Sequence, residues 1–274
     1  MTGPTFICPG AQKAGTTWLH KTLQEHPDFW MPPQKEVDYL AEFPKSREKY
    51  GVRLAAVEER WANRPKNQWR VDWWRLFTSE WNLDKYGELF APAGAKLSGD
   101  VSPNYSMMSA QEVMRAASVA PEAKIVILLR DPVARAWSHA RHVVFRGPKA
   151  DLPEDERQAA TEQFAMSKRC LGNGDYVSII NAWRSAFGSE KVFVGFYDDL
   201  ATQPQLLLSQ ILAFLGANAP PTREDDEIGA VVNQGTSMSC SEETLTALKA
   251  HYAPMVEQLR TMLPEQGSPD WLKA

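Results

Sequence analysis

The chain has 274 residues, of which 43% are apolar and 23% are charged, a balance typical of folded globular proteins rather than disordered ones. Its formal net charge of -4 and pI near 5.8 argue against a nucleic-acid-binding protein by overall electrostatics. The sequence has three scattered cysteines, no run of about 18 apolar residues and no basic leader. These features predict a cytoplasmic protein without disulfides or a membrane span.

Short apolar runs and helical periodicity alternate along the chain. The runs predict buried strands at 5–9 (TFICP), 124–129 (KIVILL) and 191–197 (KVFVGFY). Helices are predicted at 16–26, 132–144, 176–187, 204–215 and 242–263. This alternation favours an α/β fold, with a central parallel sheet flanked by helices. We expect residues 1–274 to form a single domain.

Two regions fit this alternation less well. Residues 41–94 contain five tryptophans, mixed charges and no clear strand, so we expect a helical, Trp-rich cap over the mouth of the sheet. Within it, Trp73 and Trp74 either line a ligand pocket or form the core of the cap. Residues 147–170 are expected to be a polar excursion before the next helix.

The loop after the first strand, GAQKAGTTWL at 10–19, is close to a phosphate-binding P-loop. Gly10 and Gly15 keep the spacing of G-x-x-x-x-G-K-[ST], but threonine occupies the lysine position and Lys13 lies inside the loop. The strand at 124–129 is followed by Arg130, where a nucleotide triphosphatase usually supplies a carboxylate for magnesium. Because the planar arginine fork suits phosphate, we expect a phosphate-bearing ligand that binds without a metal.

Four segments together resemble the PAPS-dependent sulfotransferases, in the bacterial and carbohydrate-type branch; PAPS is 3′-phosphoadenosine 5′-phosphosulfate. They are FICPGAQKAGTTWL at 6–19, KEVDYL at 35–40, GDVSPNYS at 99–106 and VILLRDPVARAWSHARHVVFRG at 126–147. The segment at 174–200 resembles a later helix-strand unit of the family. The resemblance implies a P-loop NTPase-like fold. It also implies metal-free, in-line transfer of a sulfuryl group from PAPS to a small-molecule or carbohydrate acceptor, with PAP as product. The acceptor group is expected to be a hydroxyl, with an amine as the less favoured alternative.

The same resemblance assigns the nucleotide-binding residues. Lys13 would contact the 5′-phosphosulfate and stabilise charge on the bridging oxygen. Arg130 and Ser138, eight residues apart, would hold the 3′-phosphate. The remaining residues implied in PAPS binding are Ala14, Gly15, Thr16, Thr17 and Trp18 in the first loop, and Asn233, Gln234 and Gly235 in a later loop.

The general base is predicted less directly. The resemblance assigns it to Glu36, whose alternative is an ion pair with Lys35. The heparan-type element E-K-[TS]-P here reads Asp100-Val101-Ser102-Pro103, without the lysine, so Asp100 is either a rival base or a supporting partner. We place Asp100, Ser102, Trp73 and Trp74 on the possible acceptor side.

Other interpretations remain open at this stage. His139 and His142 follow the 3′-phosphate segment, but each is more typical of a helix surface than of a catalyst. The alternative functions are a PAP or PAPS sensor without turnover and an atypical P-loop kinase. The acidic pI weighs against a polyanionic acceptor. The sequence identifies neither the acceptor nor the oligomeric state.

Overall fold

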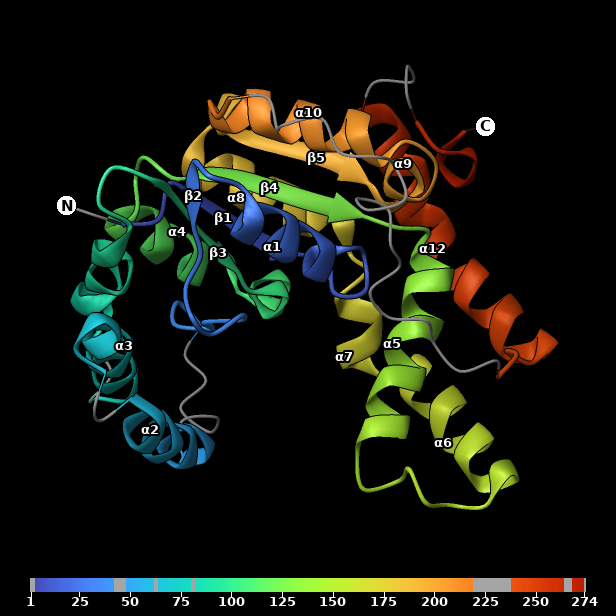
Figure 1. Cartoon of the computed structure of the whole chain (residues 1–274). Helices are drawn as coiled ribbons and strands as arrows, with labels where there is room; N and C mark the ends of the chain where they lie inside the picture. Colours follow the sequence, from blue (N-terminus) through green and yellow to red (C-terminus); the bar gives the residue numbers. More distant parts are fainter. Residues whose placement is uncertain are drawn as a thin grey trace.

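The computed structural model describes residues 3–41, 48–61, 64–79, 82–218, 238–263 and 268–273. Its centre is a parallel sheet of five strands in the order β2-β3-β1-β4-β5 (Figure 1). The strands are β1 Phe6–Gly10, β2 Phe29–Trp30, β3 Leu97–Val101, β4 Lys124–Leu129 and β5 Val192–Phe196. The predicted α/β fold with a central parallel sheet is confirmed. β1, β4 and β5 were predicted, whereas β2 and β3 were missed.

Helices connect the strands and cover the sheet. The predicted ones are α1 Thr16–Glu25, α5 Pro132–Arg146, α8 Tyr176–Phe187, α10 Pro204–Leu215 and α12 Glu242–Met262; α4 Ala110–Val119 and α9 Tyr197–Thr202 are additional. α1 contacts β2, while α4 packs on α8, which in turn contacts β4 and β5. The sheet is therefore enclosed by helices, as the alternating pattern requires.

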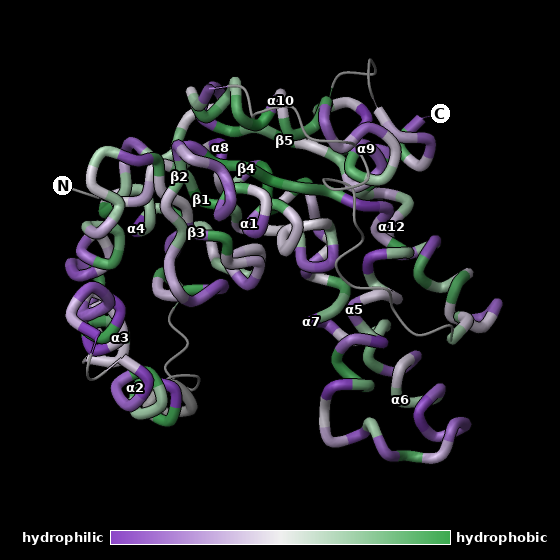
Figure 2. Tube along the Cα trace, viewed as in Figure 1, coloured by the Kyte–Doolittle hydropathy of each residue, from purple (hydrophilic) through white to green (hydrophobic). Residues whose placement is uncertain are grey.

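The core lies in the sheet because its strands are apolar on both faces. Phe6, Ile7 and Cys8 in β1 and all residues of β4 after Lys124 are buried. Figure 2 shows β4 as largely hydrophobic, in contrast to the mixed hydropathy along α2, α3 and α6. Such continuous apolar strands are typical of parallel sheets covered on both sides.

Two helical arms extend from the same side of the sheet (Figure 1). One contains α2 Glu48–Trp61 and α3 Gln68–Thr78, which confirms the predicted helical character of the 41–94 region. The other contains α5 and α6 Glu154–Ala165, followed by α7 Lys168–Gly172. The prediction of a polar excursion at 147–170 was therefore wrong for most of that stretch. α6 packs on α5 through small residues such as Ala160 and Ala165, which give little apolar signal in the sequence.

Parallel pairing brings three strand ends to one edge of the sheet. Cys8 of β1 pairs with Val101 of β3, and Gly10 pairs with Ile127 of β4. The carboxyl ends of parallel strands are where ligands bind in open α/β sheets. The residues after β1, β3 and β4 are therefore the ones to consider as a site. Within the described residues, no helix is long and apolar enough to cross a membrane.

Candidate active site

The loop between β1 and α1 is shaped by glycine and opens onto a helix N-terminus. Gly15 lies at the N-cap of α1 with φ 97°, and a Cβ at this position would lie 2.7 Å from Leu200 Cδ2. Only glycine fits both conditions. Lys13 also has a positive φ of 72°, and α1 begins at Thr16. The first N–H groups of α1 thus form an anion-binding geometry.

The rest of this loop divides into buried and accessible residues. Ala14, Thr16 and Trp18 are buried, with Trp18 only 5% exposed, so these side chains support the loop from inside. Thr17 is half-buried. At a helix N-terminus an anion is bound by backbone N–H groups, so burial of these side chains is compatible with the predicted binding role.

A hydrogen bond joins this loop to the segment that follows β4. Arg130 Nη1 donates to the Lys13 carbonyl at 3.2 Å, and its guanidinium lies 4.3 Å from the Tyr197 ring centre. Tyr176 Oη donates to the Arg130 carbonyl at 2.6 Å. Arg130 is therefore held on three sides. Ser138 lies two turns into α5 and is half-buried. The structure brings Lys13 and Arg130 together across 117 positions of sequence.

Lys13 lies in a strongly positive environment. Burial lowers the pKa of its ammonium group, and the nearby charges of Arg130, Arg146 and Arg141 lower it further. Lys13 Nζ lies 3.4 Å from His142 Nδ1, and a charged Lys13 ammonium can only be the donor in this contact. Burial and the Lys13 charge lower the pKa of His142, which favours its neutral form. The region after β4 therefore supplies a cation cluster around one lysine.

The sequence pointed to His142 as a residue more typical of a helix surface than of a catalyst, and its contact with Lys13 was not predicted. A usable signal was present: Ser138, His142 and Arg146 are spaced by four and so share one face of α5. His139, in contrast, is fully buried against Phe164, and burial together with the charges of Arg135 and Arg169 lowers its pKa to about 3. His139 is a neutral core residue.

Two interpretations were considered for Glu36, a catalytic base and an ion pair with Lys35. Glu36 Oε1 pairs with Lys35 Nζ at 2.5 Å, and the Glu36 side chain is 40% exposed. Its charge also raises the pKa values of Lys13 and His142, so the carboxylate lies on their side of the site. The ion pair and a catalytic role are therefore compatible.

A second acidic residue, Asp38, was not predicted. Its Oδ2 accepts from Asn104 Nδ2 at 2.9 Å, whereas its Oδ1 is buried without a partner. Burial, assisted by the negative charges of Glu36 and Asp100, raises the pKa of Asp38 to about 7. Nothing in the pattern KEVDYL distinguishes this carboxyl group from a solvated one, because its burial is created by residues 102–104.

The raised pKa of Asp38 predicts a pH-dependent stability. The folded state binds a proton that the unfolded state releases between about pH 4 and pH 7, so this group's contribution falls as pH rises through that window. Asp38→Asn is expected to raise the melting temperature at pH 8 and to change it much less at pH 4. Thermal unfolding at both pH values tests this, with the exposed Asp84→Asn as control. Equal shifts at the two pH values would contradict it.

Asp100 is fully buried and serves as a hydrogen-bond acceptor. Ser102 Oγ donates to its Oδ1 at 2.5 Å, while Tyr105 Oη and Tyr86 Oη donate to its Oδ2 at 2.7 and 2.9 Å. No oxygen of this carboxylate is open to an acceptor molecule. The alternative of a rival base is therefore disfavoured, and that of a supporting partner fits. Ser102 is also fully buried.

The two tryptophans placed on the acceptor side belong to the core of the cap arm. Trp73 and Trp74 are 2% and 6% exposed, and the Trp73 ring stacks on Phe77 at 5.0 Å. Trp73 Nε1 donates to the Leu89 carbonyl. Their packing corresponds to the core alternative rather than to a pocket wall, because a buried ring presents no free face.

The last two predictions concern the later nucleotide-binding loop and metal binding. Asn233, Gln234 and Gly235 lie outside the described residues, so their predicted role stays a prediction. Within the described part of the chain, no cluster of three or more His, Cys, Asp or Glu side chains is arranged to hold a metal ion.

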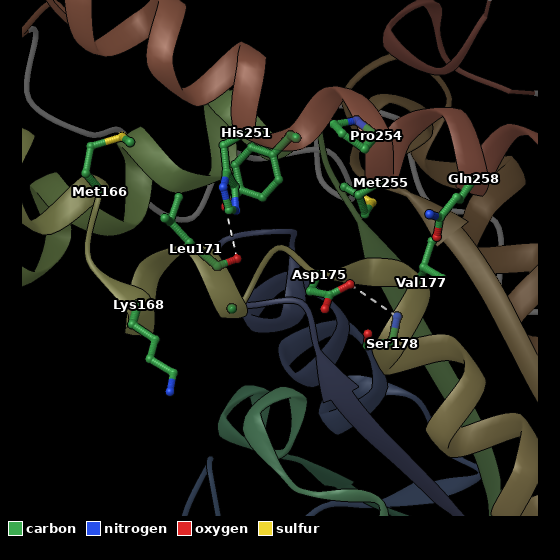
Figure 3. A pocket seen from close by; sticks show the side chains of 12 residues that line it. Met166, Lys168, Leu171, Asp175, Val177, Ser178, His251, Pro254, Met255 and Gln258 are labelled. Carbon is green, nitrogen blue, oxygen red and sulfur yellow. Dashed lines mark hydrogen bonds between the residues drawn. The ribbon is translucent and has the colours of Figure 1, made fainter.

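A separate groove of 710 Å³ lies between α7, α8 and α12 (Figure 3). Leu171, Asp175, Ser178 and Met255 are among the residues that line it. In Figure 3 the Asp175 carboxylate is hydrogen-bonded to the start of α8, where its Oδ1 accepts from the Ser178 N–H at 3.3 Å. The lining includes none of the residues predicted for the site, so we give this groove no part in the chemistry below.

The chain is similar in sequence to known sulfotransferase-containing enzymes. The chain is 28% identical over 233 residues to the human bifunctional heparan sulfate N-deacetylase/N-sulfotransferase 3, and 25% identical over 230 residues to the mouse bifunctional heparan sulfate N-deacetylase/N-sulfotransferase 1. These matches cover 78% and 79% of this chain but 22% of each relative.

The fold has a close counterpart among solved structures. The sulfotransferase from Alicyclobacillus acidocaldarius superposes with a TM-score of 0.68 at 24% identity, covering 96% of each chain. The sulfotransferase domain from the curacin biosynthetic pathway gives 0.59 at 20% identity, covering 96% of this chain and 99% of that one. The model of the Sulfotransferase family matches residues 4–221, and the chain therefore belongs to the sulfotransferase family.

Proposed function

We propose that this protein transfers the sulfuryl group of PAPS to an acceptor and releases PAP. The observation that supports this best is the contact between Arg130 and the Lys13 carbonyl. It links the loop that resembles a 5′-phosphosulfate site to the segment that resembles a 3′-phosphate site. A nucleotide with anionic groups at both the 3′ and the 5′ position of its ribose matches this pairing.

The charges of the site fit such a ligand. Burial lowers the pKa of Lys13, and repulsion by the positive charges of the surrounding arginines lowers it further. An anion between them would relieve this repulsion and raise the Lys13 pKa. The α1 N-terminus adds backbone N–H donors beside Gly15. The donor set is cationic, as a phosphosulfate requires.

Each residue has a distinct part in the proposed reaction. When bound, PAPS supplies an activated sulfuryl group on a phosphate leaving group. Lys13 stabilises the negative charge that develops on the bridging oxygen, and the Gly15–Thr17 backbone fixes the phosphate. Arg130 and Ser138 hold the 3′-phosphate. Glu36 accepts the proton of the acceptor and orients the attacking atom in line.

His142 is a second candidate for the base. Its ring nitrogen accepts from Lys13 Nζ, and its lowered pKa favours a neutral imidazole able to take a proton. We prefer Glu36 because the Lys13 ammonium already occupies His142 Nδ1. Glu36 approaches the same cation cluster with a partly exposed carboxylate that an acceptor can reach.

The acceptor is proposed to be a small molecule or a carbohydrate, bound between Lys13 and the 41–94 cap region. The relatives carry N-sulfotransferase in their names, so an amine must be tested beside a hydroxyl. A non-catalytic PAP sensor is the less favoured alternative, because His142 Nδ1 lies 3.4 Å from Lys13 Nζ and the Glu36 charge acts on Lys13. An atypical P-loop kinase lacks a lysine after Gly15.

Calorimetry with PAP in the presence of EDTA is the direct test of the proposed ligand. We expect micromolar or tighter binding, followed by PAP release from PAPS when hydroxyl and amine acceptors are screened. A strict requirement for magnesium in binding would contradict the proposal. Binding of PAP without turnover on any acceptor would favour the sensor.

Replacement of Arg130 tests the 3′-phosphate assignment. Since a charge-assisted hydrogen bond contributes roughly 1.5–3 kcal/mol, Arg130→Ala should weaken PAP binding by about 10- to 100-fold. Binding of adenosine 5′-phosphosulfate, which lacks the 3′-phosphate, should change little. Ser138→Ala should give a smaller loss with the same selectivity. Equal losses for both nucleotides would place Arg130 elsewhere on the ligand.

A further inference from the structure

The buried carboxylate of Asp100 is the end of two hydrogen-bond chains that start on the backbone of another loop. The Asp38 N–H donates to Ser102 Oγ at 3.0 Å, and Ser102 Oγ donates to Asp100 Oδ1 at 2.5 Å. The Leu40 N–H donates to Tyr105 Oη at 3.2 Å, and Tyr105 Oη donates to Asp100 Oδ2 at 2.7 Å. Each carboxylate oxygen thus holds one backbone position through one hydroxyl.

The direction of each chain is fixed by its ends. A backbone N–H can only donate, so each hydroxyl must accept from the loop and give its own proton to the carboxylate. The three side chains in these chains, Asp100, Ser102 and Tyr105, are fully buried, so water does not compete for these hydrogen bonds. A carboxylate is the acceptor that suits three hydroxyl donors at once, the third being Tyr86 Oη.

The 36–40 loop, whose Asp38 and Leu40 N–H groups start these hydrogen-bond chains, contains two residues in an unfavourable backbone conformation. Glu36 and Asp38 have φ values of 62° and 51°, in the left-handed region that residues with side chains seldom adopt. Such conformations persist when the surrounding structure fixes them, and they cluster at functional sites. The side chain of Glu36 is 40% exposed and forms an ion pair with its chain neighbour Lys35, so its direction depends on the backbone.

We propose that Asp100 is a positioning residue for the acceptor side of the site: through the Ser102 and Tyr105 hydroxyls it fixes the 36–40 backbone and so aims the Glu36 carboxylate. This inference rests on the proposed function, in which Glu36 is the base. It gives a role to a carboxylate that cannot itself reach an acceptor. It also explains why serine and tyrosine both follow Asp100 within five positions.

Amide hydrogen exchange measured by NMR tests the two chains separately. Ser102→Ala is expected to speed exchange at the Asp38 amide, and Tyr105→Phe at the Leu40 amide, each by about tenfold through loss of one hydrogen bond. Asp100→Asn should speed both. If Asp100→Asn does not fold, the two single hydroxyl variants still decide the question. Unchanged exchange at both amides would overturn the proposal.

Turnover and nucleotide binding distinguish positioning from general damage. The Ser102 and Tyr105 variants should lower kcat about tenfold or more, since a small misplacement of a reacting group is costly, while the Kd for PAP stays within about twofold. Tyr86→Phe is the matched control, because it removes a hydroxyl donor to the same oxygen but keeps the ring that packs beside Tyr39; kcat and exchange should be preserved. A fall in kcat with parallel loss of PAP binding would overturn the positioning role.

The outcome also separates this inference from the proposed function. Failure of the wild-type protein to transfer sulfate from PAPS would contradict the proposed function. The exchange pattern at Asp38 and Leu40 would still decide whether Asp100 holds the loop.

Discussion

Lys13→Ala is expected to lower kcat for sulfuryl transfer from PAPS by about 10²–10³-fold, measured as PAP formation under saturating PAPS and acceptor. The ammonium group lies within the Arg130, Arg141 and Arg146 cluster, where water is partly excluded and a charge acts strongly. The interaction that it makes with the bridging oxygen strengthens as that oxygen becomes negative. Its loss should therefore appear in kcat more than in the Kd for PAP.

Lys21→Ala provides the matched control for this experiment. Lys21 lies on α1, eight positions after Lys13, and is exposed. Removing its charge changes the net charge of the protein by the same amount without altering the site. Its kcat should remain at the wild-type value. If both Lys13→Ala and Lys21→Ala retain the wild-type kcat, Lys13 has no part in the transfer step.

The parts of the fold that the sequence predicts are those with strong local signals. β4 is a continuous apolar run, and the α8 bounds match the predicted 176–187 because Asp175 caps its start and Gly188 follows its end. β3, in contrast, reads LSGDV, and its polar residues hide a buried strand. Asp100 can be buried there because the hydroxyls of Ser102, Tyr105 and Tyr86 donate to its carboxylate. The Ser98 backbone exchanges two hydrogen bonds with the Thr5 hydroxyl, 93 positions away. Local patterns carry no record of such partners.

The same distinction applies to the candidate site. The spacing of Gly10, Lys13 and Gly15, and the Arg130–Ser138 pair, were visible because they lie within single continuous segments. The proximity of His142 to Lys13 arises only when α5 packs beside the first loop. The raised pKa of Asp38 likewise arises from burial by residues after β3. Properties created between segments were the ones that sequence reasoning missed.

Glu36→Gln is the second variant with a large expected effect. Glutamine keeps the shape of the side chain but cannot accept the acceptor's proton, so kcat should fall by about 10²–10⁴-fold while the Kd for PAP remains nearly unchanged. Rapid-quench measurement of a single turnover distinguishes the chemical step from product release. An equal loss in PAP binding would mean that the variant disturbs the nucleotide loop instead.

The Lys35–Glu36 ion pair makes a second control necessary. Lys35→Met removes the same pair, whose atoms lie 2.5 Å apart, but leaves the carboxylate in place. Because exposed pairs contribute little, about 0–1 kcal/mol, stability should change slightly and kcat should stay within a few-fold of wild type. A loss in Lys35→Met as large as in Glu36→Gln would make the pair, rather than proton transfer, the important feature. Full activity of Glu36→Gln combined with an inactive His142→Asn would instead assign the base to His142, whose Nδ1 lies 3.4 Å from Lys13 Nζ.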